Sequence, residues 1–197
     1  LSQMRALRER AGARPRVLDD IALCYAACGG DKKSVIYLLD ECGLDVMAHN
    51  YVSLSHAASV GAESIVEELL KRGVPVSIHR DQPLRWAAYF GHVDVVRRLV
   101  AAGADIGIFD HSLFSAVCSR GHLGMVEYLV EELAIDPQMN LVFYLREAVL
   151  ALHEDIVAYL LKAAHWDGSD EEFFLCYATN RGAVNILKLF LKSGGDA

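Results

Sequence analysis

Apolar and polar residues recur at helical spacing along this chain, and the whole pattern repeats every 30 or 31 residues. Six segments share one column of residue types, with an apolar residue first, small residues in the middle and a turn residue last. They read LCYAACGG, LSHAASVG, LRWAAYFG, FSAVCSRG, LREAVLAL and LCYATNRG, and they end at residues 30, 61, 91, 121, 152 and 182. A period of this length indicates one supersecondary unit stacked on copies of itself.

The third repeat shows most clearly which elements the pattern predicts. Pro83 suits the first turn of a helix, where its missing N–H costs nothing, and an apolar stripe follows it at helical spacing. Gly91 ends this helix, because the residue after a helix C-terminus often needs a positive φ. A second amphipathic helix then runs to Gly103. Each repeat is therefore predicted to be a helix–turn–helix pair, and the chain to be all-α.

Two sets of equivalent positions in the six aligned repeats support this prediction. The first set, at the start of the second helix, contains only residue types that cap helix N-termini, so we expect N-caps at Ser34, Ser64, Asp94, Gly124, Asp155 and Asn185. The second contains small pairs, which let neighbouring helices approach to about 8 Å. These pairs are Ala26-Ala27, Ala57-Ala58, Ala87-Ala88, Val117-Cys118, Ala148-Val149 and Ala178-Thr179.

The third repeat also resembles a known family. Its landmarks are Pro83-Leu84, Ala87-Ala88, Gly91-His92, Val95-Val96, Leu99 and Gly103-Ala104-Asp105. In this order they resemble the T-P-L-H, A-A, G-H, V-V, L-L and G-A-D of the ankyrin repeat, and the resemblance covers residues 19–197. It implies an ankyrin-repeat solenoid of stacked helix–turn–helix units with short finger loops and a concave face. The loops are expected to be short because about three residues of the usual ~33 are missing between Gly103 and Phe114.

The phase of the repeat predicts the domain organisation. Residues 1–18, which are basic, are expected to be the second half of a preceding repeat, and the chain to be a segment of a longer array. Six repeats follow, at approximately 19–48, 49–78, 79–108, 109–139, 140–169 and 170–197. The fifth is the least regular, because Leu152 replaces the turn glycine, and one residue is inserted before Asp136. We expect a soft point at Leu152 and an unusual loop around Pro137.

Charge and composition narrow the choice of partners and compartment. The net charge is −7, and five arginines against one glutamate give residues 1–16 a charge of +4, which leaves −11 for the rest. Such an acidic body argues against nucleic-acid binding. No apolar run is long enough to insert into a membrane. The five cysteines mostly occupy apolar positions and are read as core thiols, so we expect an intracellular protein, cytoplasmic or nuclear.

No motif in the sequence predicts catalysis, a cofactor or a metal. The stretch from Gly29 to Ser34 lacks the glycine that a phosphate loop has before Lys-Ser, so a helix turn is expected there. Histidines recur in columns at 92, 122 and 153, about one repeat apart, which is too far for shared zinc ligands. Cys24 and Cys28 are one helical turn apart but provide only two ligands. We therefore expect a non-enzyme that binds no small molecule.

The resemblance implies protein binding through the concave face, by the residues after each small pair and by the finger tips. Aromatic residues and arginines are the commonest interface hot spots. We expect binding residues at Tyr51, His79, Arg80, Asp81, Tyr89, Phe90, Phe109, Asp110, His111, Arg120 and Arg181. The alternative for Phe90 and Phe109 is that they pack between repeats.

Three functions stay open at this point. The first is an adaptor or scaffold, a monomer that holds a protein partner. The second is an architectural spacer in a longer array. The third is a regulatory or targeting arm of a larger multidomain enzyme. Nothing in the sequence identifies the partner, because in repeat arrays the target is set by surface residues and not by the fold.

Overall fold

The computed structural model describes residues 16–44, 46 and 52–193, with side chains described from residue 21 onward. Tyr51 and the basic residues 1–15 lie outside the described residues. The described residues form two compact units, the first within 1–87 and 94–105 and the second within 88–93 and 106–197.

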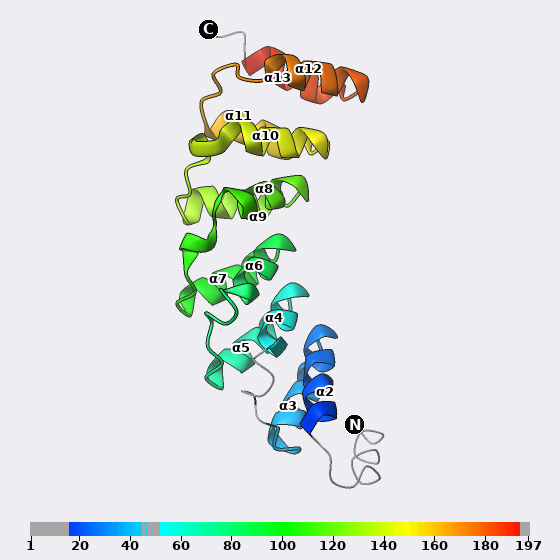
Figure 1. The fold of residues 1–197 in the computed structure, drawn as a ribbon, viewed down its shortest axis with the longest axis vertical. Helices are drawn as coiled ribbons and strands as arrows, with labels where there is room; N and C mark the ends of the chain where they lie inside the picture. The colour runs from blue at the N-terminus through cyan, green and yellow to red at the C-terminus, as the bar shows by residue number, and fades with distance from the viewer. Residues whose placement is uncertain (1–15, 45, 47–51, 194–197) are drawn as a thin grey trace. The chain divides into compact units, whose positions relative to one another are not determined.

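Both units are built from paired helices, and the described residues contain no strand (Figure 1). The all-α prediction is confirmed. The first helices of the repeats are α2 (Arg16–Cys28), α4 (Val52–Ser59), α6 (Gln82–Tyr89), α8 (His111–Ser119), α10 (Leu141–Leu150) and α12 (Glu171–Asn180). The second helices are α3 (Lys32–Asp40), α5 (Glu63–Lys71), α7 (Val93–Ala101), α9 (Leu123–Glu127) with η3 (Tyr128–Glu132), α11 (Glu154–Ala163) and α13 (Val184–Ser193).

Small residues let helices of the same kind pack on one another. Within the first unit α2 packs on α4 and α3 on α5, and within the second α8 packs on α10 and α11 on α13. Four of the predicted small pairs are completely buried, namely Ala57-Ala58, Ala87-Ala88, Val117-Cys118 and Ala148-Val149. In the first and last repeats Ala26 is half-buried and Thr179 is exposed. A larger side chain at the buried pairs would separate the repeats, because overfilling a packed core forces helices apart.

The predicted N-cap column is wrong by two or three residues. The second helices begin earlier, so the N-caps are Asp31, Ala62, His122 and His153 in the repeats where a cap is defined. Of these, Asp31 alone caps with its side chain, accepting a hydrogen bond from the Ser34 backbone N–H. The predicted residues lie inside the first helical turn, where polar and acidic types are also favoured, because the N-terminal end of a helix carries a partial positive charge.

The turn between the two helices of a repeat has the same backbone conformation throughout. Gly91 and Gly121 have φ values of 77° and 78°, and Leu152 has a φ of 62°. The expectation that Leu152 adopts the glycine conformation is confirmed. A β-carbon in this left-handed region costs on the order of 1 kcal/mol, so the fifth repeat contains local strain.

Replacing Leu152 should reveal this strain. We expect Leu152→Gly to be more stable than Leu152→Ala by about 1 kcal/mol, since both remove the half-buried side chain and only glycine relieves the backbone. Urea unfolding of the two variants measures the difference. Ala151 next to it has a right-handed backbone, so there the order should reverse, and Ala151→Gly should be less stable than the unchanged protein. Equal stability of the Leu152 variants would show that φ here is not strained.

The extra residue of the fourth repeat is absorbed at the end of its second helix. There α9 widens into the π-helical turn η3, and the Ile135 N–H donates to the Leu129 carbonyl, six residues back. The interval from the first turn, at residue 30, to the second, at residue 61, is also 31 residues, and it contains the same six-residue closure, from Leu44 to Leu38. Regular repeats close over five residues, as Ala104 does to Leu99. The loop around Pro137 also differs, as expected, because it forms the short helix η4 (Pro137–Asn140).

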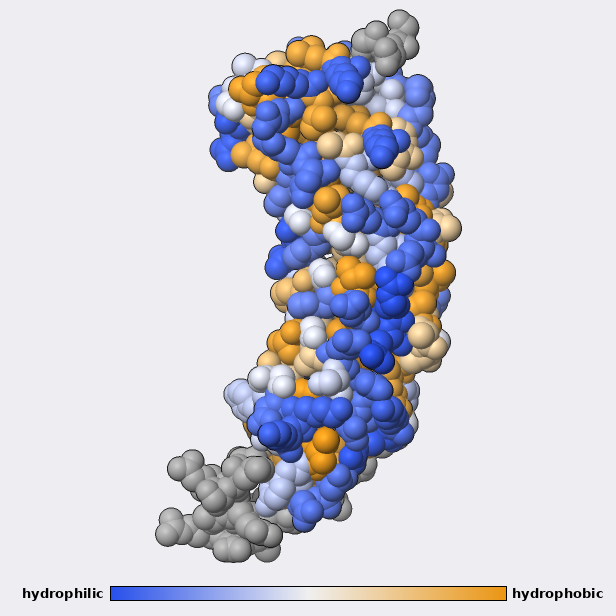
Figure 2. Space-filling view, turned by 180° about the vertical axis from the view of Figure 1, so that it is seen from behind, coloured by the Kyte–Doolittle hydropathy of each residue, from blue (hydrophilic) through white to orange (hydrophobic). Residues whose placement is uncertain are grey.

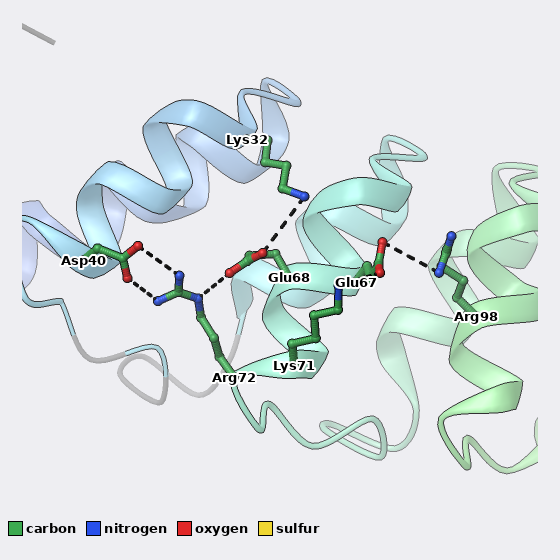
Figure 3. Close-up of polar contacts among 7 residues, drawn as sticks. All are labelled: Lys32, Asp40, Glu67, Glu68, Lys71, Arg72 and Arg98. Carbon is green, nitrogen blue, oxygen red and sulfur yellow. Dashed lines mark hydrogen bonds and ion pairs between the residues drawn. The ribbon is translucent and has the colours of Figure 1, made fainter.

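Ion pairs link successive second helices in the first unit (Figure 3). Arg72, at the C-cap of α5, donates to Asp40 of α3 at 2.7 Å and to Glu68 of its own helix at 2.8 Å. Arg98 of α7 reaches Glu67 of α5 at 3.8 Å. The hydrogen bond from Arg72 is the main cause that lowers the pKa of Asp40. These partners are exposed or half-buried, so their contribution to stability is small and should weaken in salt.

Candidate protein-binding surface

The turn after α6 displays two aromatic side chains next to each other. The apolar stripe of α6 buries Leu84, Ala87 and Ala88 completely, which leaves the following two residues outside the core. Tyr89 is 37% exposed and Phe90 is 40% exposed. Their rings meet edge to face, with centroids 5.2 Å apart and an interplanar angle of 87°. The helix end therefore fixes a pair of aromatic rings at the surface.

Arg120, the C-cap of α8, completes a cluster with these rings. Its Nη1 donates to the Tyr89 hydroxyl at 2.8 Å, and its Cζ lies 4.0 Å from the Tyr89 ring centroid. The Phe90 ring is 5.4 Å from the same carbon. One of the guanidinium donors is thus used to hold the side chain in place, and a guanidinium has five. We call Tyr89, Phe90 and Arg120 the aromatic–arginine surface.

A histidine packs against the turn that carries this surface. The ring of His122 lies against the backbone of Gly91, so close that a β-carbon there would be 2.6 Å from the ring. The pKa of His122 is lowered, first by burial and then by the positive charge of Arg120. The imidazole is therefore neutral at neutral pH and adds no charge to the surface.

The structure brings three of the predicted binding residues together in this surface and places others elsewhere. Phe109 does not join them: it is buried, which matches the alternative of packing between repeats. Asp110 is the N-cap of α8, accepting from the Leu113 N–H at 3.0 Å, and His111 beside it is exposed. Arg181 is the C-cap of α12, the position that Arg120 has in α8, and its Cζ lies 6.0 Å from the Tyr177 ring.

The finger residues 79–81 belong to the first unit. His79, Arg80 and Asp81 have φ values of 48°, 59° and 57°, which makes one left-handed turn closed by the Gln82 N–H on the Ile78 carbonyl. His79 and Arg80 are exposed, whereas Asp81 is buried and offers no binding surface. None of the three is glycine, and the only sequence signal for this turn is weak, since His and Asp are enriched among non-glycine residues with positive φ.

A second cluster was missed by the sequence analysis. Arg146 of α10 lies 4.8 Å from the Phe173 ring and pairs with Asp170, and Phe173 stacks on Tyr177 at 5.9 Å. Arg146 and Phe173 precede the small pairs Ala148-Val149 and Ala178-Thr179 in their helices. They were missed because the sequence analysis considered only the residues after each small pair and the finger tips.

The cysteines are less buried than expected. Only Cys118 is in the core, where burial raises its thiol pKa to about 12, while Cys28 and Cys176 are exposed. Their helices are amphipathic, and both residues fall outside the buried stripe. Within the described ranges, no three His, Cys, Asp or Glu side chains are grouped so that they could hold a metal ion. No helix in that part of the chain is long and apolar enough to cross a bilayer.

Comparisons with known proteins agree with this architecture. A sequence model of ankyrin repeats in three copies matches residues 23–110, 54–141 and 84–170. No curated protein matches the chain by sequence. Among solved structures, the human ASB11 ankyrin repeat domain is similar, with a TM-score of 0.69 and 24% identity over 88% of this chain and 84% of that one. At this identity the likeness shows a shared fold.

Proposed function

This chain belongs to the ankyrin repeat family, and from that premise we propose that it is a non-catalytic adaptor whose aromatic–arginine surface binds a protein partner. Ankyrin repeats are generally protein–protein interaction modules. The position of Tyr89 and Arg120 at the ends of first helices supports this proposal, because in ankyrin repeats such ends are expected to face the concave, binding side. We further propose an intracellular partner, because the five cysteines are odd in number and include no C-x-x-C pair.

The observation that carries the proposal is the position of the Arg120 guanidinium on the exposed Tyr89 ring. Tyrosine and arginine are the side chains most often found at interface hot spots. Here they are held in one arrangement before any partner binds, so less side-chain entropy is lost on association. A purely packing role would bury these rings, yet more than a third of each remains exposed.

The proposal predicts that Tyr89→Ala with Arg120→Ala removes partner binding without changing helical content. Loss of a stacked aromatic–arginine pair should weaken binding by about tenfold or more, since hot-spot truncations cost about 2 kcal/mol. A photo-crosslinker at Phe90, followed by quantitative mass spectrometry of crosslinked proteins, measures the loss. Circular dichroism checks the fold.

Tyr25→Ala is the matched control, because Tyr25 is an exposed tyrosine on another first helix. It should leave crosslinking at Phe90 unchanged. If the double variant captures the same proteins in the same amounts, the surface is not a binding site, and an architectural spacer becomes the better account.

A further inference from the structure

Apolar side chains are also exposed in η4, which forms part of a finger, and at the start of α10 directly after it. Met139 is 79% exposed and Phe143 is 60% exposed. Both line a hollow whose other wall is formed by residues 165–167, in the finger before α12. Figure 2 shows hydrophobic side chains reaching the surface between polar ones, and isolated cases are ordinary in a folded protein. Two large apolar side chains at one hollow are less ordinary.

The hollow is rigidly built. The side chain of Gln138 pairs twice with the backbone of His165, donating from Nε2 to its carbonyl at 2.9 Å and accepting from its N–H at 2.8 Å. Trp166 next to it is buried against Phe174 and Phe190, with ring centroids 6.2 and 5.0 Å away. The two fingers are thus fixed to each other and to the core, so the hollow exists before any partner arrives.

The surroundings of the hollow are strongly acidic. Asp167 lines the hollow itself. Asp170, Glu171 and Glu172 line a second hollow that begins at Gly168, the next residue along the chain, and Asp136 directly precedes η4. All five of these carboxylates are exposed, and the arginine and lysine between residues 136 and 172 are Arg146 and Lys162. Arg146 is paired with Asp170 and covers the Phe173 ring, so it neutralises one of the five. Hydrogen bonds from Ser169 lower the pKa of Asp167 and keep it charged.

We propose that this finger surface, Met139 and Phe143 with Asp167, Glu171 and Glu172, docks a lysine- or arginine-rich segment of another protein that presents an apolar side chain to the hollow. Exposed carboxylates attract a basic segment, and the apolar hollow gives it a fixed register. The same charges repel nucleic acid and anionic lipid. The finger surface shares no residue with the aromatic–arginine surface, so the two proposals stand independently.

Titration of a fluorescein-labelled helical peptide of lysine and leucine against the full chain tests the proposal. We expect Phe143→Ala and the pair Glu171→Gln with Glu172→Gln each to weaken binding by about fivefold to tenfold, because each removes one half of the recognition. The charge-matched pair Glu41→Gln with Asp94→Asn should change it by less than about twofold, since both residues are exposed and belong to the first unit, whereas the finger surface belongs to the second.

Three outcomes would overturn the proposal. If both charge-neutralising pairs weakened peptide binding equally, the peptide would be attracted to the acidic chain as a whole and not to the finger surface. An unchanged affinity in Phe143→Ala would mean that the hollow takes no apolar side chain. Concentration-dependent self-association that Phe143→Ala abolishes would identify a second copy of this chain as the occupant. The variant Tyr89→Ala with Arg120→Ala should bind the peptide normally, so failure here is distinguishable from failure of the adaptor proposal.

Discussion

Gly121→Ala is expected to destabilise the second unit by about 3 kcal/mol or more. The position has a φ of 78°, which alone costs a β-carbon on the order of 1 kcal/mol. The larger part is steric. A β-carbon at Gly121 would lie 2.4 Å from Cε1 and 2.7 Å from Nδ1 of His153, whose Nε2 is 3.2 Å from the Ser119 carbonyl. The ring cannot move away without giving up that contact, and overpacked sites cost about 1–3 kcal/mol. Chemical denaturation monitored by circular dichroism measures the loss.

Gly182→Ala is the control for the backbone contribution. Gly182 has a φ of 67°, and a β-carbon there meets nothing within 4 Å. Its alanine variant should therefore lose only about 1 kcal/mol. Adding His153→Ala to Gly121→Ala removes the clash and should cost less than the sum of the two single changes. Additive losses in this double variant would contradict the steric explanation.

Phe190→Ala is expected to have the other large effect, a loss of about 3–5 kcal/mol. Phe190 of α13 is completely buried, and its ring stacks on Phe174 at 4.6 Å with an interplanar angle of 7°. Trp166 meets it edge-on at 5.0 Å. Removing the ring leaves a cavity between α12, α13 and the preceding finger. Hydrogen exchange should show faster exchange in α12 and α13 than in α8, because repeat arrays lose structure locally.

Phe143→Ala is the matched control for that substitution. It removes the same side chain from a site that is mostly exposed, so the free energy of unfolding should change by less than about 0.5 kcal/mol. This also means that the peptide-binding test can use it as a folded variant. Uniform acceleration of exchange across the unit in Phe190→Ala would show that the second unit unfolds as one cooperative body.

Sequence reasoning was most successful where one residue type satisfies a steric demand. The turn between the two helices of a repeat has glycine at the same position in five of the six repeats, and the exception, Leu152, adopts the same left-handed backbone. The geometry of the helix–turn–helix unit therefore determines this backbone conformation more strongly than the residue type at the turn does. Buried small pairs such as Ala57-Ala58 were predictable for the same reason, since close helix packing tolerates few alternatives.

Sequence reasoning was wrong where several positions or residue types could fill the same structural role. The N-caps were misplaced because polar residues are favoured at more than one position of a first helical turn, and His122 and His153 cap without a side-chain hydrogen bond. Of the candidate binding residues, the Tyr89–Arg120 contact could be anticipated, because the two residues are one repeat apart and each lies near the end of its first helix. The burial of Phe109 and the pairing of Gln138 with His165 could not, because both depend on how the fingers fold.

The widened ends of the second helices have a consequence for how such an array can change. The first and fourth repeats each gain one residue before the finger begins, and the next repeat still starts in the same column. A single-residue insertion at this junction therefore leaves the downstream helices in phase, whereas one inside a first helix would rotate every later side chain of that helix by about 100°. Repeats of unequal length can consequently be exchanged at the end of the second helix, before the finger, without disturbing the helix surfaces on either side.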